Sequence, residues 1–196
     1  MAIELPAQPG TRHLKIEPLD FGFVQRGADG AATTRIDRPG NRFRVTASWP
    51  FMKPAEASVF QVRLERARGQ PLRLVMPLLG ETQGAPGSPV VDGTDSGGTT
   101  LKLKTASPGY VVKEGYWLTL VHAGVYHLHR AAAVAVVGAD GKATLTVEPP
   151  LRVFPANGDA VLLARPMIEG LVTALEPYEH PVNRRIQLTA TIEESA

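Results

Sequence analysis

The chain of 196 residues contains no cysteine. Disulfide bridges, thiolate nucleophiles and cysteine-ligated metal centres are therefore excluded, because each of them needs a thiol. Aromatic residues make up only 6% of the sequence. This low content disfavours a carbohydrate-binding module, which would normally display a platform of exposed aromatic rings.

Long hydrophobic runs are also missing. The longest apolar run covers residues 131–137, whereas a helix needs about 20 apolar residues to cross a bilayer. Residues 1–6 contain neither the basic segment nor the apolar stretch of a secretory signal. We therefore expect a soluble protein that is made in the cytoplasm and does not insert into membranes.

An excess of charge of one sign is absent as well, because 21 Lys and Arg residues balance 19 Asp and Glu residues to a net charge of +2. A nucleic-acid-binding protein usually carries a denser basic stripe, so we prefer a mixed, solvated surface. Glycine and proline, in contrast, are abundant, with 19 and 17 residues that follow no period. They favour many short strands and turns over a helical bundle.

Two segments alternate in polarity with the two-residue period of a β-strand. Their apolar members are Phe43, Val45, Ala47 and Trp49 in residues 42–49, and Ile186, Leu188, Ala190 and Ile192 in residues 185–192. Period two places each set on one face of its strand. We predict that the two strands are partners in one amphipathic sheet.

Residues 54–68 form the one convincing helical pattern of the chain. Pro54 suits a first helical turn, where its missing N–H costs nothing. Ala57, Phe60 and Leu64 form an apolar stripe at helical spacing, and Gly69 is a natural residue just past a helix end. Residues 72–76 then alternate again as a strand.

Residues 80–100 interrupt the pattern with glycine, proline and threonine, and we interpret them as a loop or linker. We interpret residues 1–32 as an irregular lead with a short strand at 14–16, followed by a β-prone segment at 33–36. From residue 101 the pattern is entirely β. The further predicted strands cover residues 99–105, 116–122, 125–130, 131–137, 143–148, 160–164 and 167–173, with a hairpin turn at 137–142.

These elements predict a mainly β protein with one helix and two units. The strands at 42–49 and 185–192 need a core in common with the helix, although they lie far apart in the sequence. We therefore predict a discontinuous domain that carries an inserted small β-barrel. Its first part covers residues 1–90, the barrel covers 91–165, and the last part covers 166–196.

Three histidines are the best candidates for a metal site. His127 and His129 share a face of their strand, and His122 lies nearby. A useful site needs further ligands, and no carboxylate lies at a matching spacing. We therefore prefer surface or hairpin histidines and predict no metal.

Other catalytic patterns are weak. Ser96 lies in a Gly-rich stretch without the G-x-S-x-G motif of a hydrolase. Residues 138–142 have two residues between their glycines, whereas a phosphate-binding P-loop has four. The carboxylate pairs Glu176/Glu179 and Glu193/Glu194 are expected to be solvated with no reason for a shifted pKa. We predict no enzymatic activity and no cofactor.

Arg42 and Arg44 lie on the polar face of the strand at 42–49, and Arg185 and Gln187 lie on the polar face of the last strand. A solvated sheet face would explain these residues. The planar guanidinium of arginine is also favoured at interfaces. We assign the four residues to a subunit interface or to the lining of a channel.

A strand ending in Trp49-Pro50-Phe51-Met52, the helix that follows it, and a strand ending in Met76-Pro77 together resemble the belt domain of distal tail (baseplate hub) proteins of long-tailed, siphovirus-type bacteriophages. Residues 113–166 resemble a small β module that recurs in phage tail proteins. The segments that carry this second resemblance are Lys113-Glu114-Gly115-Tyr116, Val125-Tyr126-His127, Ala139-Asp140-Gly141-Lys142-Ala143-Thr144, Pro149-Pro150-Leu151-Arg152 and Gly158-Asp159-Ala160-Val161.

The resemblance implies a tail-tube-like β-sandwich, the belt domain, with an inserted barrel similar to oligonucleotide/oligosaccharide-binding domains. In the family, six copies form a ring that joins the tail tube to the baseplate hub or tail tip and anchors further components such as fibres. The tape-measure protein and DNA pass through the ring, and no residue is catalytic. The protein is then expected in the virion, at the tail tip or baseplate.

Two other classes stay open at this point. One is a different minor tail or tail-tube subunit, which would differ in its position along the tail. The other, less favoured, is a carbohydrate-binding module.

Overall fold

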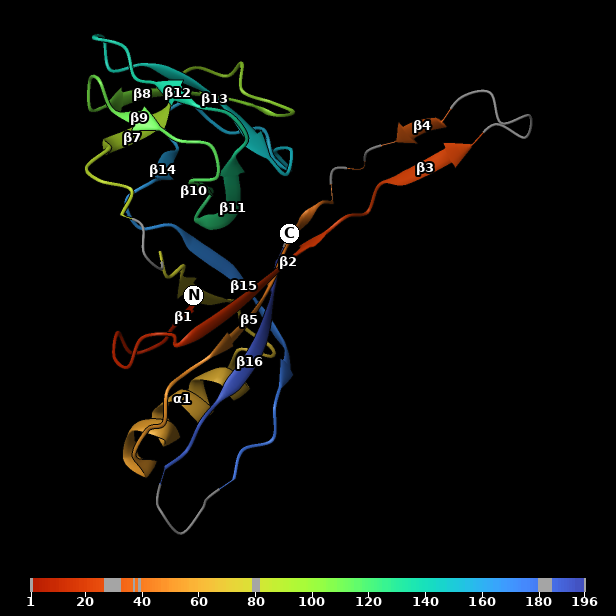
Figure 1. The fold of residues 1–196 in the computed structure, drawn as a ribbon, viewed down its shortest axis with the longest axis vertical. Coiled ribbons are helices and arrows are strands. Elements are labelled where there is room, and N and C mark those ends of the chain that lie inside the picture. The colour runs from red at the N-terminus through yellow and green to blue at the C-terminus, as the bar shows by residue number, and fades with distance from the viewer. Residues whose placement is uncertain are drawn as a thin grey trace.

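A computed structural model describes residues 2–26, 33–36, 38, 40–78, 82–179 and 185–195. Within these residues the protein is mainly β, has one helix, and contains a closed six-stranded barrel beside a six-stranded sheet, which confirms the predicted fold class. Figure 1 shows the barrel at one end of the molecule and the helix at the other.

The six-stranded sheet is built from both ends of the chain. Its strands, in spatial order, are β1 (Ile3–Glu4), β6 (Leu72–Val75), β15 (Met167–Leu175), β16 (Thr189–Glu194), β5 (Arg42–Ser48) and β2 (His13–Leu19). The β1–β6 pair is parallel and the other pairs are antiparallel. β5 and β16 are direct neighbours, with Val45 opposite Ile192, so the predicted partnership is confirmed.

The helix covers one face of this sheet. α1 (Pro54–Arg66) buries Ala57, Phe60 and Leu64, as its apolar spacing predicts. Phe60 meets Trp49, the residue after β5, edge to face with ring centroids 5.7 Å apart. Trp49 is on the same face as Phe43, Val45 and Ala47, because side chains alternate along a strand. This is the covered face of the sheet.

The barrel is a separate closed sheet with its own core. Its strands, in spatial order, are β10 (Trp117–His122), β11 (Val125–Ala131), β13 (Ala143–Glu148), β8 (Thr100–Ala106), β7 (Gly87–Val91) and β14 (Ala160–Leu162), and a small sheet pairs β9 (Val111–Val112) with β12 (Ala135–Val136). The barrel core consists of fully buried aliphatic residues such as Leu103, Leu120 and Leu145.

The barrel and α1 lie on the same face of the sheet. Leu128 of β11 belongs to the core of the sheet, and Trp117 of β10 meets Phe43 edge to face at 5.2 Å. Phe43 and Trp49 stand near opposite ends of β5, so the barrel covers one end of this face and the helix covers the other.

Three sequence-based expectations were wrong. The supposed linker at 80–100 contains β7, a barrel strand whose first residues, Gly87 to Pro89, concealed its β character. The lead at 1–32 contains the predicted strand at 14–16 as part of β2, but it is less irregular than expected, because β1 and β3 (Phe23–Arg26) also lie in it. The strand predicted at 131–137 is reduced to the short β12.

A narrow arm projects from the sheet. It is the hairpin of β3 and β4 (Thr33–Ile36), which are antiparallel with Phe23 opposite Ile36. In Figure 1 the arm extends away from both the sheet and the barrel. Asp20 at its base accepts a hydrogen bond from Arg35 at 2.8 Å.

Candidate functional site

The face of the sheet opposite the helix and the barrel is polar, and no described part of the chain covers it as α1 and the barrel cover the other face. Period two directs the side chains of Arg42, Arg44 and Thr46 to this side. The hydroxyl oxygens of Thr46 and Thr191 lie 3.0 Å apart. Hydroxyl pairs and ion pairs across strands thus form a polar surface, which we call the open face.

Glu193 pairs with two arginines on the open face. Its two carboxylate oxygens accept hydrogen bonds from Arg42 at 2.6 Å and from Arg44 at 2.8 Å. Hydrogen bonds from Arg42 and then Arg44 lower the pKa of Glu193 below its ordinary value. The expectation of a solvated carboxylate without a shifted pKa is therefore wrong for Glu193, which is 18% exposed and paired.

The four residues assigned to an interface or channel lie on one side of the sheet. Arg42 and Arg44 stand at one end of β5, whereas Arg185 and Gln187 precede β16 and are exposed. Ile186 and Leu188 between and after them are buried, so alternation directs Arg185 and Gln187 to the open side. The role assigned to these residues stays a prediction.

His122, His127 and His129 lie on the β10–β11 hairpin, as one of our two interpretations has it, but His127 and His129 are not on the surface. His127 is 3% exposed and His129 is fully buried, because the barrel interior covers their side of β11 while the sheet covers Leu128 on the other. Burial first, and then the charge of Arg152, lowers the pKa of His127 to about 4. Burial likewise lowers the pKa of His129 to about 3.

His122 has a partner of its own, although its charge contributes to the lowered pKa of His127. It is half-buried and its Nδ1 lies 2.6 Å from a carboxylate oxygen of Asp159. Among the residues that the structure describes, no group of three or more His, Cys, Asp or Glu side chains could hold a metal ion.

A buried ion pair at the junction of barrel and sheet was missed by the sequence analysis. Arg152, which follows β13, is hydrogen-bonded through Nη2 to Oε1 of Glu194 at the end of β16. Glu194 also accepts the backbone N–H groups of Leu128 at 2.7 Å and Phe43 at 3.1 Å. The alternation of the last strand could have revealed it, because Glu194 lies on the same side of the strand as the buried residues Ala190 and Ile192.

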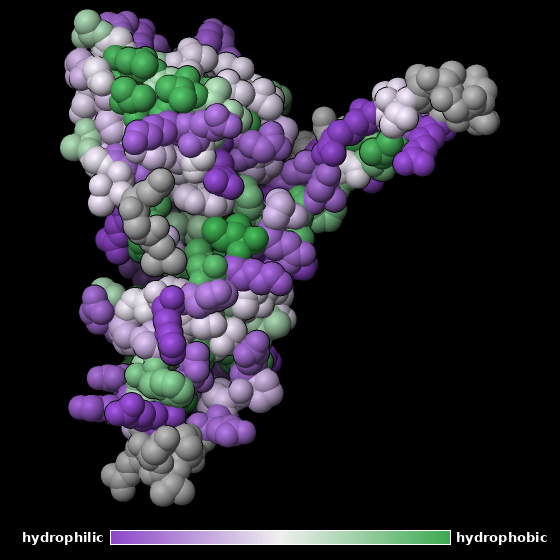
Figure 2. Space-filling view, in the orientation of Figure 1, coloured by the Kyte–Doolittle hydropathy of each residue, from purple (hydrophilic) through white to green (hydrophobic). Residues whose placement is uncertain are grey.

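A groove of about 650 Å³ separates the base of the arm from the barrel. Its apolar lining includes Ile16, Phe43, Trp117 and Pro149, and charged residues such as Arg42 stand around it. Figure 2 shows hydrophobic surface in this region and a second patch on the arm. The groove could accept an extended or apolar segment of another molecule.

The remaining sequence candidates have structural roles. Gly138 to Lys142 form a tight turn in which the N–H of Gly138 donates to the carbonyl of Lys142 at 2.8 Å. The predicted hairpin is not formed, because β12 pairs with β9 and β13 pairs with β11 and β8. Ser96 is 2% exposed and its hydroxyl accepts the N–H of Lys102 at 3.0 Å. Neither feature contributes to a site.

Within the described residues, no helix is long and apolar enough to cross a membrane. Neither known protein-family models nor curated proteins match this sequence.

Proposed function

We propose that the chain is a structural protein of a phage tail: a distal tail protein whose copies form a ring between the tail tube and the baseplate or tail tip. The observation that carries this proposal is the one-sided sheet. The helix and the barrel both pack on the covered face, which leaves a polar open face of paired charges and hydroxyls. A ring of such sheets can direct its open faces toward a channel.

The arm supports an assembly of several copies. It exposes large apolar side chains, with Phe23 45%, Val24 51% and Ile36 37% exposed. A two-stranded hairpin is marginally stable by itself in water, and clustered exposed apolar residues mark interaction sites. A neighbouring subunit would cover these residues and stabilise the arm.

The barrel suits the attachment of further tail components. Val111, Val134 and Val136 are 40%, 62% and 62% exposed, and the first and last are paired across β9 and β12. Figure 2 shows a hydrophobic patch on the barrel, in the part farthest from the sheet. A fibre or side protein could dock there while the sheet remains in the ring.

Imaging of assembled particles, or of the protein mixed with its tube and hub partners, tests the proposal. We expect a six-fold ring at the junction of tube and baseplate, the number six coming from the family resemblance. Dilute protein alone does not decide the matter, because partners stabilise a ring by mass action. A monomeric spike or a location at the head would overturn the proposal.

A matched pair of variants sharpens this test. Phe23→Ser on the arm is expected to abolish incorporation into the ring, whereas Phe154→Ser, at a residue that is 85% exposed on the barrel, is expected to leave it intact. Equal incorporation of both variants would remove the arm from the interface.

The same images distinguish another minor tail or tail-tube subunit, which would lie elsewhere along the tail. A carbohydrate-binding module receives less support from the aromatic residues. Trp49 is buried in the sheet core, and the Arg130 guanidinium lies 4.7 Å from the ring centroid of Trp117. Neither tryptophan is displayed as a sugar platform.

A further inference from the structure

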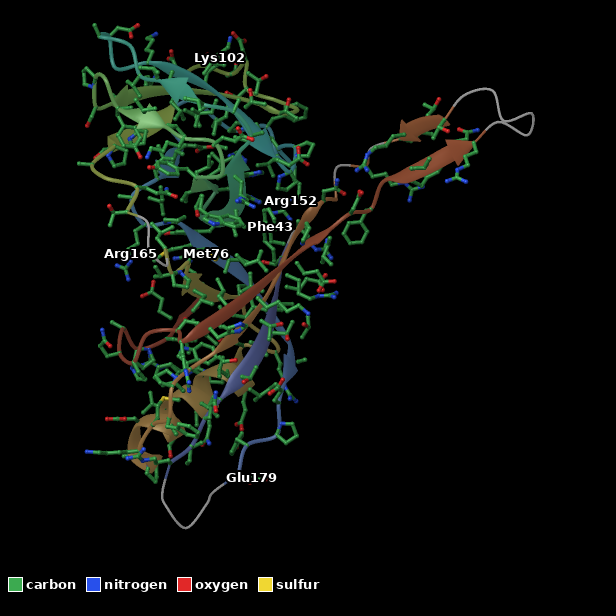
Figure 3. The ribbon with its side chains drawn as sticks, viewed as in Figure 1. Phe43, Met76, Lys102, Arg152, Arg165 and Glu179 are labelled. Atoms are coloured by element: carbon green, nitrogen blue, oxygen red, sulfur yellow. The ribbon has the colours of Figure 1, made fainter. Side chains whose placement is uncertain are left out.

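The groove between the base of the arm and the barrel is lined by both units of the molecule. The sheet contributes Ile16, Pro18 and Phe43, and the barrel contributes Trp117 and Pro149. Figure 3 labels Phe43 at this junction of sheet and barrel. The volume of about 650 Å³ is within the range of about 300–1,000 Å³ that is typical of ligand pockets. The groove therefore has the size and the polarity to receive a few apolar side chains of another segment.

Two carboxylates on the barrel side of the groove have no counter-charge. Glu114 and Glu148 line the groove and are exposed, and neither forms an ion pair with any other described residue. Arg130 is opposite Glu148 in the barrel sheet, but its guanidinium lies over the ring of Trp117, 4.7 Å from the ring centroid. Arg42 on the sheet side is paired on the open face. The groove thus suits an occupant that carries apolar side chains and a cation.

One face of the arm carries the matching groups. Phe23 and Ile36 are opposite each other across β3 and β4, so their side chains are on the same face of the hairpin, where they are 45% and 37% exposed. Arg38 lies on this face too, because its guanidinium carbon is 5.3 Å from the centroid of the Phe23 ring. Among the described residues, Arg38 has no carboxylate partner. This face therefore combines an apolar pair with an unpaired cation.

The arm of a molecule does not cover the groove of the same molecule. In Figure 1 the arm extends away from both the sheet and the barrel. Contacts at its base hold it in this direction. Arg35 donates a hydrogen bond to Asp20 at 2.8 Å, and the backbone N–H of Phe21 donates to the side-chain oxygen of Asn41 at 2.8 Å. The guanidinium of Arg42 lies 4.9 Å from the centroid of the Phe21 ring. The arm is thus directed toward another molecule.

We propose that the groove of one copy receives the arm of a second copy, with Phe23 and Ile36 against the apolar lining and Arg38 beside the carboxylates of Glu114 and Glu148. The arm and the groove are different surfaces, so each copy offers its arm to one neighbour and its groove to the other. Such head-to-tail contacts close a ring or continue as a filament. The groove also stabilises the arm, because a two-stranded hairpin is marginal alone. The inference rests on the proposed function in one respect, namely that copies of the chain assemble.

Cross-linking between two single-cysteine proteins tests this contact, since the chain itself has no cysteine. Thr34→Cys is on the same face of the arm as Ile36, two residues away, and Ala132→Cys is at an exposed residue that lines the groove. The two full-length proteins, one of them with an affinity tag, are mixed and treated with a short bismaleimide. One sample is a concentrated solution, and the other is assembled with the tube and hub partners. We expect a covalent dimer that contains one copy of each protein.

A matched cysteine outside the groove provides the control. Ala139→Cys, at an exposed alanine of the barrel that does not line the groove, replaces Ala132→Cys and should give several-fold less mixed dimer. No excess over this control in either sample would overturn the inference. A ring that is seen by imaging without the cross-link would overturn the inference but not the proposed function. Cross-linking in solution without a ring in the assembled particles would overturn the proposed function but not the inference.

The same two cysteines distinguish a second copy from the arm of the same chain. The double variant Thr34→Cys/Ala132→Cys is treated with the bismaleimide at high dilution, where copies rarely meet. It should stay free of an internal cross-link, because the contacts at the base hold the arm away from its own groove. A monomer that is linked internally would show that the groove receives the arm of its own chain, and the inference would then be wrong.

Charge reversal tests the chemistry of the contact. Arg38→Glu in the protein with the arm cysteine should lower the yield of mixed dimer several-fold, and so should Glu114→Lys/Glu148→Lys in the protein with the groove cysteine. The two changes together should restore much of the yield, because opposite charges face each other again. Arg26→Glu, on the opposite face of the arm, is the matched control and should leave the yield unchanged. A yield that does not respond to Arg38→Glu, or that falls equally with Arg26→Glu, would refute the assigned contact.

Discussion

Glu193 and Glu194 are adjacent in the sequence but lie on opposite faces of the sheet. Glu193 is on the open face, where Arg42 and Arg44 share its carboxylate and 18% of its side chain is exposed. Glu194 is on the covered face, fully buried under the barrel with Arg152 as its counter-charge. The same residue type is therefore partly exposed to water on one face and fully enclosed by protein on the other.

The comparison shows what each face can tolerate. On the open face, water can solvate a charge that has lost its partner, so removing one ion pair costs little stability. These pairs also remain accessible to a second molecule. On the covered face no water replaces a lost partner, so removal of one charge leaves the other buried and unpaired. We expect substitutions on the covered face to affect folding and those on the open face to affect assembly.

Arg152→Met should give the largest effect. It leaves the Glu194 carboxylate buried without a counter-charge, and breaking such a pair costs about 3–5 kcal/mol of unfolding free energy. Arg44→Met, on the open face, is the matched control and should cost a small fraction of this. Urea denaturation at pH 7.5 measures both, and equal losses would erase the distinction between the faces.

Leu64→Ala should be next, because Leu64 is fully buried between α1 and the covered face. Truncation of a buried leucine costs about 2–5 kcal/mol. Val62→Ala lies on the same helix but at a residue that is 54% exposed, and it should stay within about 0.5 kcal/mol. Thermal melts of the two variants test which side of α1 packs on the sheet. Similar losses in both would show that this assignment is wrong.

The sequence predicted the covered face well wherever polarity alternated without interruption. The apolar residues of β5 and the stripe of α1 are where period two and period 3.6 place them. The alternation of β16 also places Glu194 on the buried side, but we expected solvent exposure because the residue is charged and lies near the chain end. Only the fold reveals why this carboxylate is tolerated, since Arg152 reaches it from 42 residues away.

The histidines that sequence reasoning misplaced lie on a strand that is covered on both sides. A strand that is covered on both sides has no polar face to reveal its period. His127, Leu128 and His129 of β11 are therefore all buried, between the barrel interior and the sheet. β7 was hidden differently, because Gly87 and Pro89 are typical of loops, although a short barrel strand tolerates them.

The pH dependence of stability compares the open face with a buried group in the barrel interior. His127 must stay neutral in the folded protein, and its pKa is about 4 there and near 6.5 when unfolded. The contribution of His127 to stability is complete above pH 6.5 and falls by about 2–3 kcal/mol as the pH drops toward 4, because the unfolded chain binds the proton, and His129 adds a loss of the same sign. His127→Gln should reduce this slope in urea denaturation at a series of pH values, and the share due to His129 should remain.

The pKa of Glu193, in contrast, is lowered on the open face. Its contribution to stability persists through this window and is lost only as the pH falls below the ordinary range of a carboxylate. Glu193→Gln should therefore leave the slope between pH 6.5 and about 5 unchanged. A slope altered equally by both substitutions would mean that Glu193 on the open face is as strongly desolvated as His127 in the barrel.

The smallest expected effect concerns the hydroxyl pair of Thr46 and Thr191 on the open face, whose oxygens are 3.0 Å apart. Thr191→Val removes one hydroxyl at nearly constant volume, and because both residues are half-exposed, water can satisfy the remaining one. We expect a loss within about 0.5 kcal/mol, and no further loss in Thr46→Val/Thr191→Val. If this face lines a channel or meets a neighbour, the double variant should nevertheless change ring formation with the tube and hub partners. A large loss of monomer stability would show instead that the open face contributes to folding as the covered face does.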